Sequence, residues 1–411
     1  MAVIRPFCAV RPAVEYADKV AALPYDVYNR AEAKKEVERE PLSFLAIDRA
    51  ETQFEDSVSV YAPEVYAKAK ELFEERISQG IFIEDKQSAY YIYQLEMNGR
   101  TQTGIAACAS VDDYLDGTIK KHENTREEKE QDRIRHVDTL SAQTGPIFLA
   151  YPSQATINQL VSKIMETQEP LYDFTAADGI AHRMWKVTEE AVTTLQEAFA
   201  GIQEIYIADG HHRAASAVKV GLKRRKEHPD YDGTEEFNYF LSVLFPDDQL
   251  MIMDYNRCVK DLHGLTKEAF LKAVEECFDV TVLDGAKHPQ AKGQITMYLE
   301  NRWYLLQAKQ ELLAITDPVA ALDVSLLQEY LLKPVLGIED PRTDERIDFI
   351  GGIRGLEELE RRVQTDMTVA FAMYPTSIGE LFAVADAGLL MPPKSTWFEP
   401  KLRSGLLMHR I

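Results

Sequence analysis

The order of hydrophobic and polar positions predicts helices and β-hairpins interleaved along the chain. Residues 31–40 and 63–79 are rich in helix-forming side chains; the first range carries opposite charges three and four positions apart, and the second has one apolar face. Residues 88–97 and 101–110 are rich in β-branched or aromatic side chains on either side of Asn98-Gly99. Asn-Gly favours the tight turn of a hairpin, so the two ranges are expected to pair.

A second group of elements surrounds the segment with the most unusual residues. Apolar ranges at 144–151, 204–208 and 237–245 predict buried strands, and a helix is expected from His212 to about Lys226. Residues 249–255 are expected to pair with the strand at 237–245 through a short turn.

The rest of the chain predicts helices at 188–199, 266–277, 325–332 and 378–387, and strands at 294–299, 303–308 and 369–374. Because strict strand–helix–strand alternation is absent, the expected fold class is α+β or mixed α/β. A chain of 411 residues is long enough for two domains. They are predicted at 1–255 and 256–411, the second being a C-terminal α/β lobe whose tail is a candidate to return to the site.

Charge and cysteine usage narrow the function classes. The net charge of −21 opposes binding to nucleic acid, which needs a basic surface, but a few converging cations can still bind a small anion. The four cysteines lie far apart without a CxxC pair, which predicts free buried thiols at Cys8, Cys108, Cys258 and Cys277. No signal peptide and no membrane-spanning run is evident, so a cytoplasmic protein without a membrane partner is expected.

The sharpest local signal is Ala208–Arg213. An apolar strand ends, Gly210 permits a sharp turn, and a helix begins with two histidines and an arginine. The first backbone N–H groups of a helix are unpaired and favour anions, and the arginine fork suits phosphate geometry. The functional interpretation is phosphate or carboxylate capture; the structural alternative is that Asp209 caps the helix while the histidines are solvated.

Two further segments carry clustered polar residues. Lys120–His136 is either the solvated face of a helix or a polar segment that closes over a phosphorylated ligand. Met391–Lys401 is either an anchor for the chain end or a second contact to an anion, through Lys394, Ser395 and Thr396. The common nucleotide-binding loops and the zinc-protease and hydrolase motifs are absent from the sequence.

Read together, five blocks resemble the bacterial domain-of-unknown-function family 1015. They are Leu-Pro-Tyr-Asp-Val (23–27), Lys-Lys-His-Glu-Asn-Thr (120–125) with Asp-Arg (132–133), Gly-Pro-Ile-Phe (145–148), Ala-Asp-Gly-His-His-Arg (208–213) and Pro-Pro-Lys-Ser-Thr-Trp-Phe-Glu-Pro-Lys (392–401). That family is similar to the ParB/SpoOJ group, and its Asp-Gly-His-His-Arg element resembles the phosphate-holding turn of ParB, sulfiredoxin and the free-serine kinases. The resemblance implies a ParB/sulfiredoxin-like core with large insertions.

The resemblance also implies roles for particular residues. The turn has no cysteine, which argues against sulfinic-acid reduction, and no DNA-binding helix-turn-helix is evident, which leaves phosphoryl transfer. Candidate catalytic residues are Asp209, His211, Glu123 and Asp26. Candidate cofactor-binding residues are Gly210, His212, Arg213, Lys120, His122, Thr125, Arg126, Arg133, Lys394, Ser395 and Thr396.

Three functions are compatible with this pattern. The first is a small-molecule phosphotransferase that moves a phosphoryl group from a nucleotide or pyrophosphate, with Mg²⁺, to a small hydroxyl compound. The second is a non-catalytic module that binds a nucleotide or phosphorylated metabolite, and the third is a phosphate-ester hydrolase. In each case the expected partner is a small phosphorylated or hydroxylated metabolite. The sequence leaves the metal and the oligomeric state open.

Overall fold

The computed structural model describes residues 2–411, which form two compact units. The first unit contains the chain up to Leu250 together with Pro400–Ile411, and the second contains Met251–Glu399. The division falls five residues before the predicted boundary. The predicted extent of the second lobe is wrong for the last twelve residues, because they belong to the first unit.

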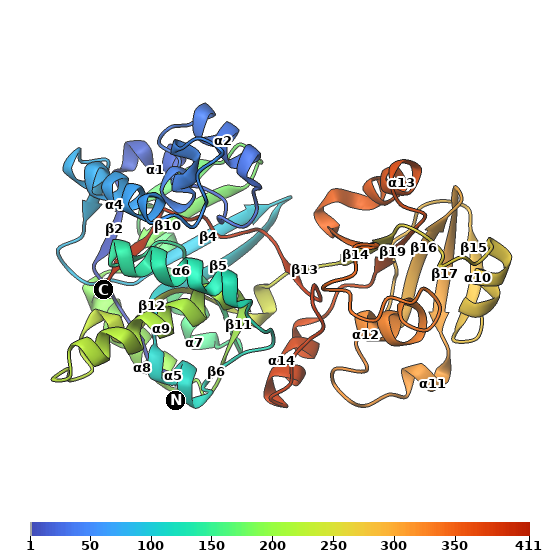
Figure 1. Ribbon diagram of the computed structural model, residues 1–411. Helices are drawn as coiled ribbons and strands as arrows, with labels where there is room; N and C mark the ends of the chain where they lie inside the picture. Colours follow the sequence, from blue (N-terminus) through green and yellow to red (C-terminus); the bar gives the residue numbers. More distant parts are fainter. Residues whose placement is uncertain (1) are drawn as a thin grey trace. The chain divides into compact units, whose positions relative to one another are not determined.

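A nine-stranded mixed sheet organises the first unit, in the order β6-β11-β8-β12-β5-β4-β10-β9 with β1 paired to β5 (Figure 1). Its strands are β1 (Ile4–Arg5), β4 (Tyr91–Met97), β5 (Arg100–Ser110), β6 (Ile119–Lys120), β8 (Ile147–Tyr151), β9 (Tyr172–Thr175), β10 (Ala181–Lys186), β11 (Ile205–Asp209) and β12 (Tyr239–Pro246). A four-stranded sheet joins β2 (Ala9–Pro12), β3 (Phe82–Glu84), β7 (Ala142–Gln143) and β21 (Met408–Arg410). The chain end is therefore a strand in this unit.

The α-helices of the first unit lie between these strands in sequence. They are α1 (Ala17–Val20), α2 (Arg30–Arg39), α3 (Leu45–Asp48), α4 (Pro63–Ser78), α5 (Val111–Asp116), α6 (Glu127–Leu140), α7 (Ala155–Thr167), α8 (Glu189–Ala200) and α9 (His211–Glu227). Helix α2 starts with a capping box between Asn29 and Glu32, and α4 starts with Pro63, where a missing N–H costs nothing.

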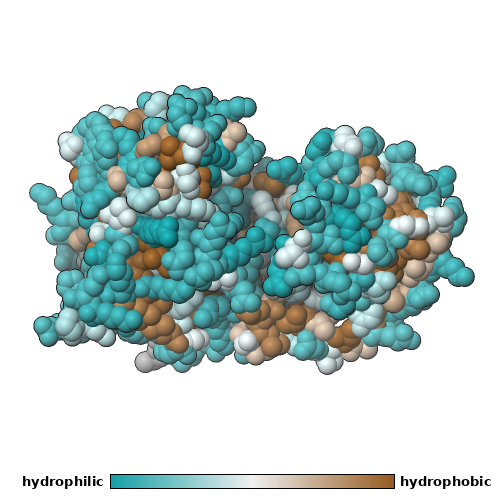
Figure 2. Space-filling view, viewed as in Figure 1, coloured by the Kyte–Doolittle hydropathy of each residue, from teal (hydrophilic) through white to brown (hydrophobic). Residues whose placement is uncertain are grey.

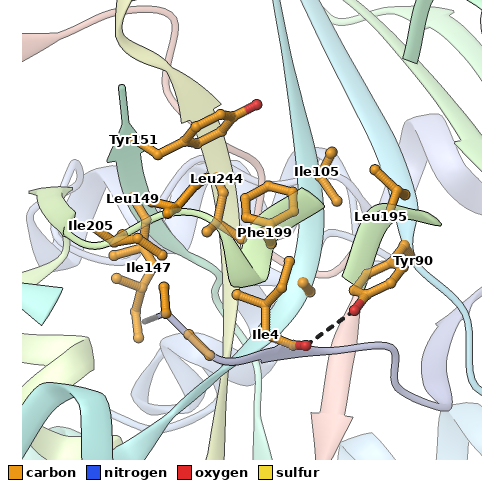
Figure 3. Packing of buried hydrophobic residues seen from close by; sticks show 14 of the residues in the cluster. Ile4, Tyr90, Ile105, Ile147, Leu149, Tyr151, Leu195, Phe199, Ile205 and Leu244 are labelled. Carbon is orange, nitrogen blue, oxygen red and sulfur yellow. Dashed lines mark hydrogen bonds between the residues drawn. The ribbon is translucent and has the colours of Figure 1, made fainter. Parts of the chain in front are cut away.

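Buried apolar side chains fix the strand that carries the site. Ile205 of β11 packs with Ile147 and Leu149 of β8 and with Leu244 of β12, as Figure 3 shows. In the same cluster the hydroxyl of Tyr90 donates to the Ile4 carbonyl at 3.1 Å. Burial of such side chains stabilises a fold by about 1.5–3 kcal/mol each. The end of β11 is therefore held on a rigid sheet.

The second unit is built on an antiparallel sheet in the order β15-β17-β16-β19-β14-β18. Its strands are β13 (Ile252–Met253), β14 (Tyr255–Val259), β15 (Phe278–Leu283), β16 (Gln294–Leu299), β17 (Arg302–Ala308), β18 (Ile347–Gly351), β19 (Val369–Met373) and β20 (Trp397–Phe398). Its α-helices are α10 (Lys267–Val274), α11 (Gln310–Leu313), α12 (Asp323–Leu327), α13 (Gly355–Thr365) and α14 (Ile378–Asp386). On the face drawn in Figure 2, polar side chains cover most of each unit.

The prediction of a mixed α/β fold is confirmed, and both predicted hairpins form, β4–β5 and β16–β17. The pairing predicted for residues 249–255 is wrong. β13 pairs with β20, and β14 pairs with β18 and β19. Those partners are remote in sequence, and local alternation of side chains cannot reveal them. The prediction that all four cysteines are buried also fails, because Cys8 is exposed and Cys277 is half-buried.

Candidate functional site

The turn between β11 and α9 has the geometry that the sequence predicts. The pairing of β11 with β8 shifts register between Ile207 and Asp209, and such irregularities re-aim side chains at strand ends. Gly210 then adopts φ +93°, a left-handed conformation that favours glycine. A Cβ at Gly210 would lie 3.0 Å from an Nη atom of Arg213. The glycine thus provides both the bend and the space for the guanidinium.

Asp209 is tied to the chain end. Its Oδ1 accepts from the Gly210 N–H at 2.8 Å, and its Oδ2 lies 3.0 Å from the Lys401 ammonium. Burial opposes ionisation of Asp209, but Lys401 and Arg213 outweigh it and hold the carboxyl pKa well below its usual range. Asp209 is therefore an anion that is paired with Lys401. Through this ion pair, residues 400–411 contribute to the site.

The two histidines that begin α9 hold the preceding loop through their rings. The backbone N–H of Arg126 donates to His212 Nε2 at 2.9 Å, and that of His122 donates to His211 Nε2 at 3.5 Å. His211 Nδ1 then carries the proton and faces Glu123 Oε2 at 3.5 Å. Burial lowers the pKa of both rings. Both rings are therefore neutral near pH 7 and add no positive charge to the turn.

His122 is the most isolated polar side chain of the site. Its ring meets the His211 ring edge-on, with centroids 4.4 Å apart, and its Nδ1 is buried without a hydrogen-bond partner among residues 2–411. Burial lowers its pKa to about 4, only partly offset by Asp209 and the carbonyl of Ile207. The His122 imidazole is thus neutral, lies against the His211 ring, and keeps one nitrogen without a hydrogen bond.

Arg213 is the candidate phosphate ligand with the clearest free capacity. One Nη donates to the Pro146 carbonyl at 2.6 Å, and the guanidinium makes no ion pair within 4 Å among the described residues. It lines a small cavity of about 30 Å³, named here the Arg213 pocket, that is partly open to solvent. The other lining residues are Tyr25, Asp48, Arg133, His136, Val137, Gln143, Thr144, Gly145, Ile147, Ala217, Leu241 and Ser404.

A larger cavity of about 210 Å³, the Asp26 pocket, shares four of these residues: Tyr25, Asp48, Arg133 and His136. Its remaining lining residues are Asp26, Tyr28, Ile47, Arg49, Ala50, Glu51, Val60, Tyr61, Val65, Tyr66, Ala69, Lys129 and Asp132. The shared residues form a wall between the two pockets.

The shared wall is a network of buried charges. Asp48 accepts from the Thr144 hydroxyl at 2.9 Å and lies 3.9 Å from Arg133 and 3.8 Å from His136. Burial and Arg133 lower the His136 pKa to about 4. Buried charges that are paired and hydrogen-bonded hold a fixed geometry, which is the condition for a preorganised pocket.

The structure gathers most of the predicted site residues in the first unit. Glu123, Arg126 and His122 meet the start of α9, and Arg133 and Asp26 line the pockets. Two predicted ligands are engaged elsewhere. Lys120 lies 2.5 Å from Glu204, and Thr125 donates to Glu130 at 2.7 Å.

Lys394, Ser395 and Thr396 belong to the second unit. The Lys394 ammonium lies over the ring of Tyr255, 5.3 Å from its centre, and the Ser395 hydroxyl donates to the Pro392 carbonyl at 2.7 Å. The Lys394 and Ser395 carbonyls accept from Arg257 and Thr376. These contacts match the anchoring alternative, and an anion contact for the three residues stays a prediction.

Sequence reasoning missed Lys401, Tyr25 and Asp48 as site residues. Lys401 and Tyr25 lie inside blocks that carried the family resemblance, and Tyr25 stands next to Asp26. Asp48 directly follows the apolar stretch Leu45–Ile47 and gives no local signal of its role.

Residues 2–411 contain neither a preformed metal-binding cluster nor a membrane-spanning helix. No group of three or more His, Cys, Asp or Glu side chains is arranged to hold a metal ion. Nor is any helix in that range long and apolar enough to cross a membrane.

Residues 4–325 match the model of a protein family described as "Protein of unknown function (DUF1015)", so the chain belongs to this family. No match was found among curated proteins. Among solved structures, a free serine kinase variant in complex with AMP is similar with 13% identity and a TM-score of 0.36, over 73% of this chain and 92% of the other. A conserved hypothetical protein from Pyrococcus furiosus shares 15% identity, with a TM-score of 0.35 over 74% of this chain and 94% of its own. C-terminally truncated SbnI from Staphylococcus aureus shares 12% sequence identity, with a TM-score of 0.39 over 73% of this chain and 87% of its own.

Proposed function

We propose that the first unit is a small-molecule phosphotransferase, which moves a phosphoryl group from a nucleotide or pyrophosphate to a small hydroxyl compound. The observation that carries the proposal is Arg213. Its guanidinium lines a cavity at the start of α9, donates one hydrogen bond to a carbonyl, and makes no ion pair within 4 Å among the described residues. In a chain of net charge −21, an arginine with no carboxylate within 4 Å is suited to an anionic ligand.

The surroundings of Arg213 strengthen the attraction for phosphate. Helix α9 has 17 residues and no side-chain cap, so its first amides carry the positive end of the helix dipole. The ammonium of Lys401 lies at the same turn, although Asp209 balances part of its charge. Binding of a phosphate group here is thus favoured by one guanidinium, the helix amides and a lysine.

Glu123 and His211 supply a candidate base. The Glu123 side chain is 44% exposed and can reach a bound acceptor, and it lies 3.5 Å from His211 Nδ1. In the transfer, the acceptor oxygen forms a bond to phosphorus while the bond from phosphorus to the donor's bridging oxygen breaks. The acceptor proton passes to Glu123, and the shortened donor leaves with the bridging oxygen.

Magnesium was predicted together with the nucleotide. The described residues contain no preformed group of three metal-binding side chains, and Asp209 already has Lys401 as its counter-ion. The side chains present do not fit a resident metal site, so no step above is assigned to a metal held by the protein.

The proposal is tested by incubating the purified chain with ATP, ADP or pyrophosphate and a panel of small hydroxyl compounds, and detecting phosphorylated product. Arg213→Ala is expected to lower turnover and phosphate-ligand affinity at least ~10-fold, because a charge-assisted contact is lost. Lys223→Ala, an exposed position on the same helix, is the matched control and is expected to leave both unchanged. Equal turnover in Arg213→Ala and wild type contradicts the proposal.

One observation favours a second candidate, a binding module without turnover. Asp209 is paired with Lys401, and both histidines at the start of α9 use Nε2 to hold the loop, which leaves few groups for proton transfer. This candidate predicts that pyrophosphate raises the melting temperature while no product forms with any acceptor.

A further inference from the structure

The wall between the two pockets contains a tyrosine that the proposed function has not used. Tyr25 lines both the Arg213 pocket and the Asp26 pocket, and Arg133 stacks on its ring with the guanidinium carbon 4.0 Å from the ring centre. An Nη of Arg49 donates to the Tyr25 carbonyl at 2.9 Å and to the Tyr28 carbonyl at 2.7 Å. Both the ring and the backbone of Tyr25 are therefore held in place.

The hydroxyl of Tyr25 has no hydrogen-bond partner among residues 2–411, and Tyr25 is half-buried, so the hydroxyl is open to solvent. The hydroxyl of Tyr66, which also lines the Asp26 pocket, is already used, because it donates to Asp132 at 2.8 Å. Tyr25 therefore presents an accessible donor with unused capacity where the two pockets meet, and a ligand there can supply the partner.

Charge at this position favours an acceptor group on that ligand. Burial raises the pKa of Tyr25, so the hydroxyl keeps its proton near pH 7 and acts as a donor. The guanidinium of Arg213, which lines the same pocket, is a second donor without a carboxylate partner. Two convergent donors with unused capacity suit an anionic oxygen.

We propose that Tyr25 is a ligand-binding residue whose hydroxyl donates to the same anionic group that Arg213 binds, at the junction of the two pockets. The ligand class is a phosphate ester or phosphoanhydride, with its anionic group in the Arg213 pocket and its organic body extending into the larger Asp26 pocket. This assignment rests on the proposed function for its phosphate chemistry. It adds Tyr25 to the proposed binding residues, and it assigns the anionic group and the organic body of the ligand to different pockets.

The test is titration calorimetry of the full chain with pyrophosphate and with ADP, on wild type, Tyr25→Phe and Tyr239→Phe. Tyr25→Phe keeps the ring and its stacking on Arg133 and removes only the hydroxyl. Tyr239→Phe removes a hydroxyl of the first unit that lies outside the lining of both pockets. Tyr25→Phe is expected to weaken both ligands about 10-fold, the loss typical of a hydrogen bond to a charged group, while Tyr239→Phe retains wild-type affinity for both.

The outcomes separate this inference from the proposed function. Equal pyrophosphate affinity in wild type and Tyr25→Phe overturns the role of Tyr25, even when phosphoryl transfer is observed. Weaker binding by Tyr25→Phe without transfer by wild type supports the role and refutes the phosphotransferase. Absence of binding by wild type overturns both. An unchanged melting temperature of unliganded Tyr25→Phe shows that the hydroxyl acts on the ligand and not on the fold.

Discussion

The two units each contain a buried strand that runs through glycine into a helix, and the two turns differ in what surrounds them. In the first unit, β11 leads through Gly210 into α9. One carboxylate, Asp209, accepts from the Gly210 N–H, and two cations, Arg213 and Lys401, lie at the same turn. In the second unit, β18 ends at Gly351 and α13 begins at Gly355.

Acidic groups fill the second turn. The carboxylate of Asp254 occupies the space beside Gly352, and a carboxylate oxygen of Glu357 approaches Gly355. Arg354 points outward, is 69% exposed, and lies 3.9 Å from Glu358. A glycine turn before a helix is thus not sufficient for an anion site. What distinguishes the first turn is a guanidinium that lines a pocket and a lysine that pairs with the local carboxylate.

The largest expected difference between the units is in their response to pH. In the first unit, burial lowers the His122 pKa to about 4 from an unfolded value near 6.5, so the unfolded chain binds the proton more tightly. In the second, burial raises the Asp323 pKa to about 7 from 3.8, so the folded unit binds the proton more tightly. Between pH 6.5 and 4, the contribution of His122 to the free energy of unfolding falls by about 3 kcal/mol as the pH falls. Over the same range, the contribution of Asp323 falls by about 3 kcal/mol as the pH rises.

Hydrogen exchange of β11 and of β16, corrected for intrinsic rates, follows the two units separately. His122→Gln is expected to flatten the pH slope of β11 only, and Asp323→Asn that of β16 only. Slopes of the same sign in both strands, unaffected by the two substitutions, would refute these assignments.

The next effect concerns packing at the second turn. Gly352→Ala is expected to destabilise the second unit by about 2 kcal/mol, because the new Cβ would lie 2.1 Å from Asp254 Oδ1 and 2.9 Å from a backbone oxygen. Pyrophosphate affinity should be unchanged. Urea unfolding measures the first quantity and calorimetry the second. Gly379→Ala, where a Cβ meets nothing within 4 Å, is the control, and loss of pyrophosphate binding in Gly352→Ala would contradict the separation of roles.

The smallest effect is at Lys401. Lys401→Met leaves Asp209 without its counter-ion, and the expected loss of stability is about 1 kcal/mol, because the pair is partly open to solvent. The Asp209 pKa should rise towards its unfolded value, so Lys401→Met should lose less stability than wild type as the pH falls below about 4. Lys401→Arg should retain most of both properties. Chemical denaturation between pH 2 and 7 measures them, and identical curves for Lys401→Met and wild type would show that the ion pair is unimportant.

Local patterns predicted the elements around the site well. The structure contains the predicted strand at 204–208 as β11 and the predicted helix from 212 as α9, with Gly210 between them. Both could be predicted because a buried strand and an amphipathic helix each have a hydrophobic pattern that is visible within a few residues. The loop at 120–126 was also singled out by its polar residues, and it does meet the start of α9.

The remaining features depend on long-range contacts. β21 has three residues and pairs with β2 and β7, which lie hundreds of positions earlier, so no periodicity identifies it. The charge state of the two histidines that begin α9 depends on burial, which lowers their pKa, and burial follows from packing that the local sequence does not show. Asp48 and Arg133 meet only because α3 and α6 bring them together.

The order of synthesis gives the returning segment Pro400–Ile411 a consequence for biogenesis. The residues that contribute Lys401 and β21 are translated only after all of Met251–Glu399 has been made. During that interval the nascent first unit has β2 and β7 with unfilled edges, and Asp209 lacks its lysine. A polypeptide released after the second unit is complete, but before residues 400–411 are made, would therefore carry an incomplete first unit. The first unit can thus bind its ligand only after translation of the whole chain.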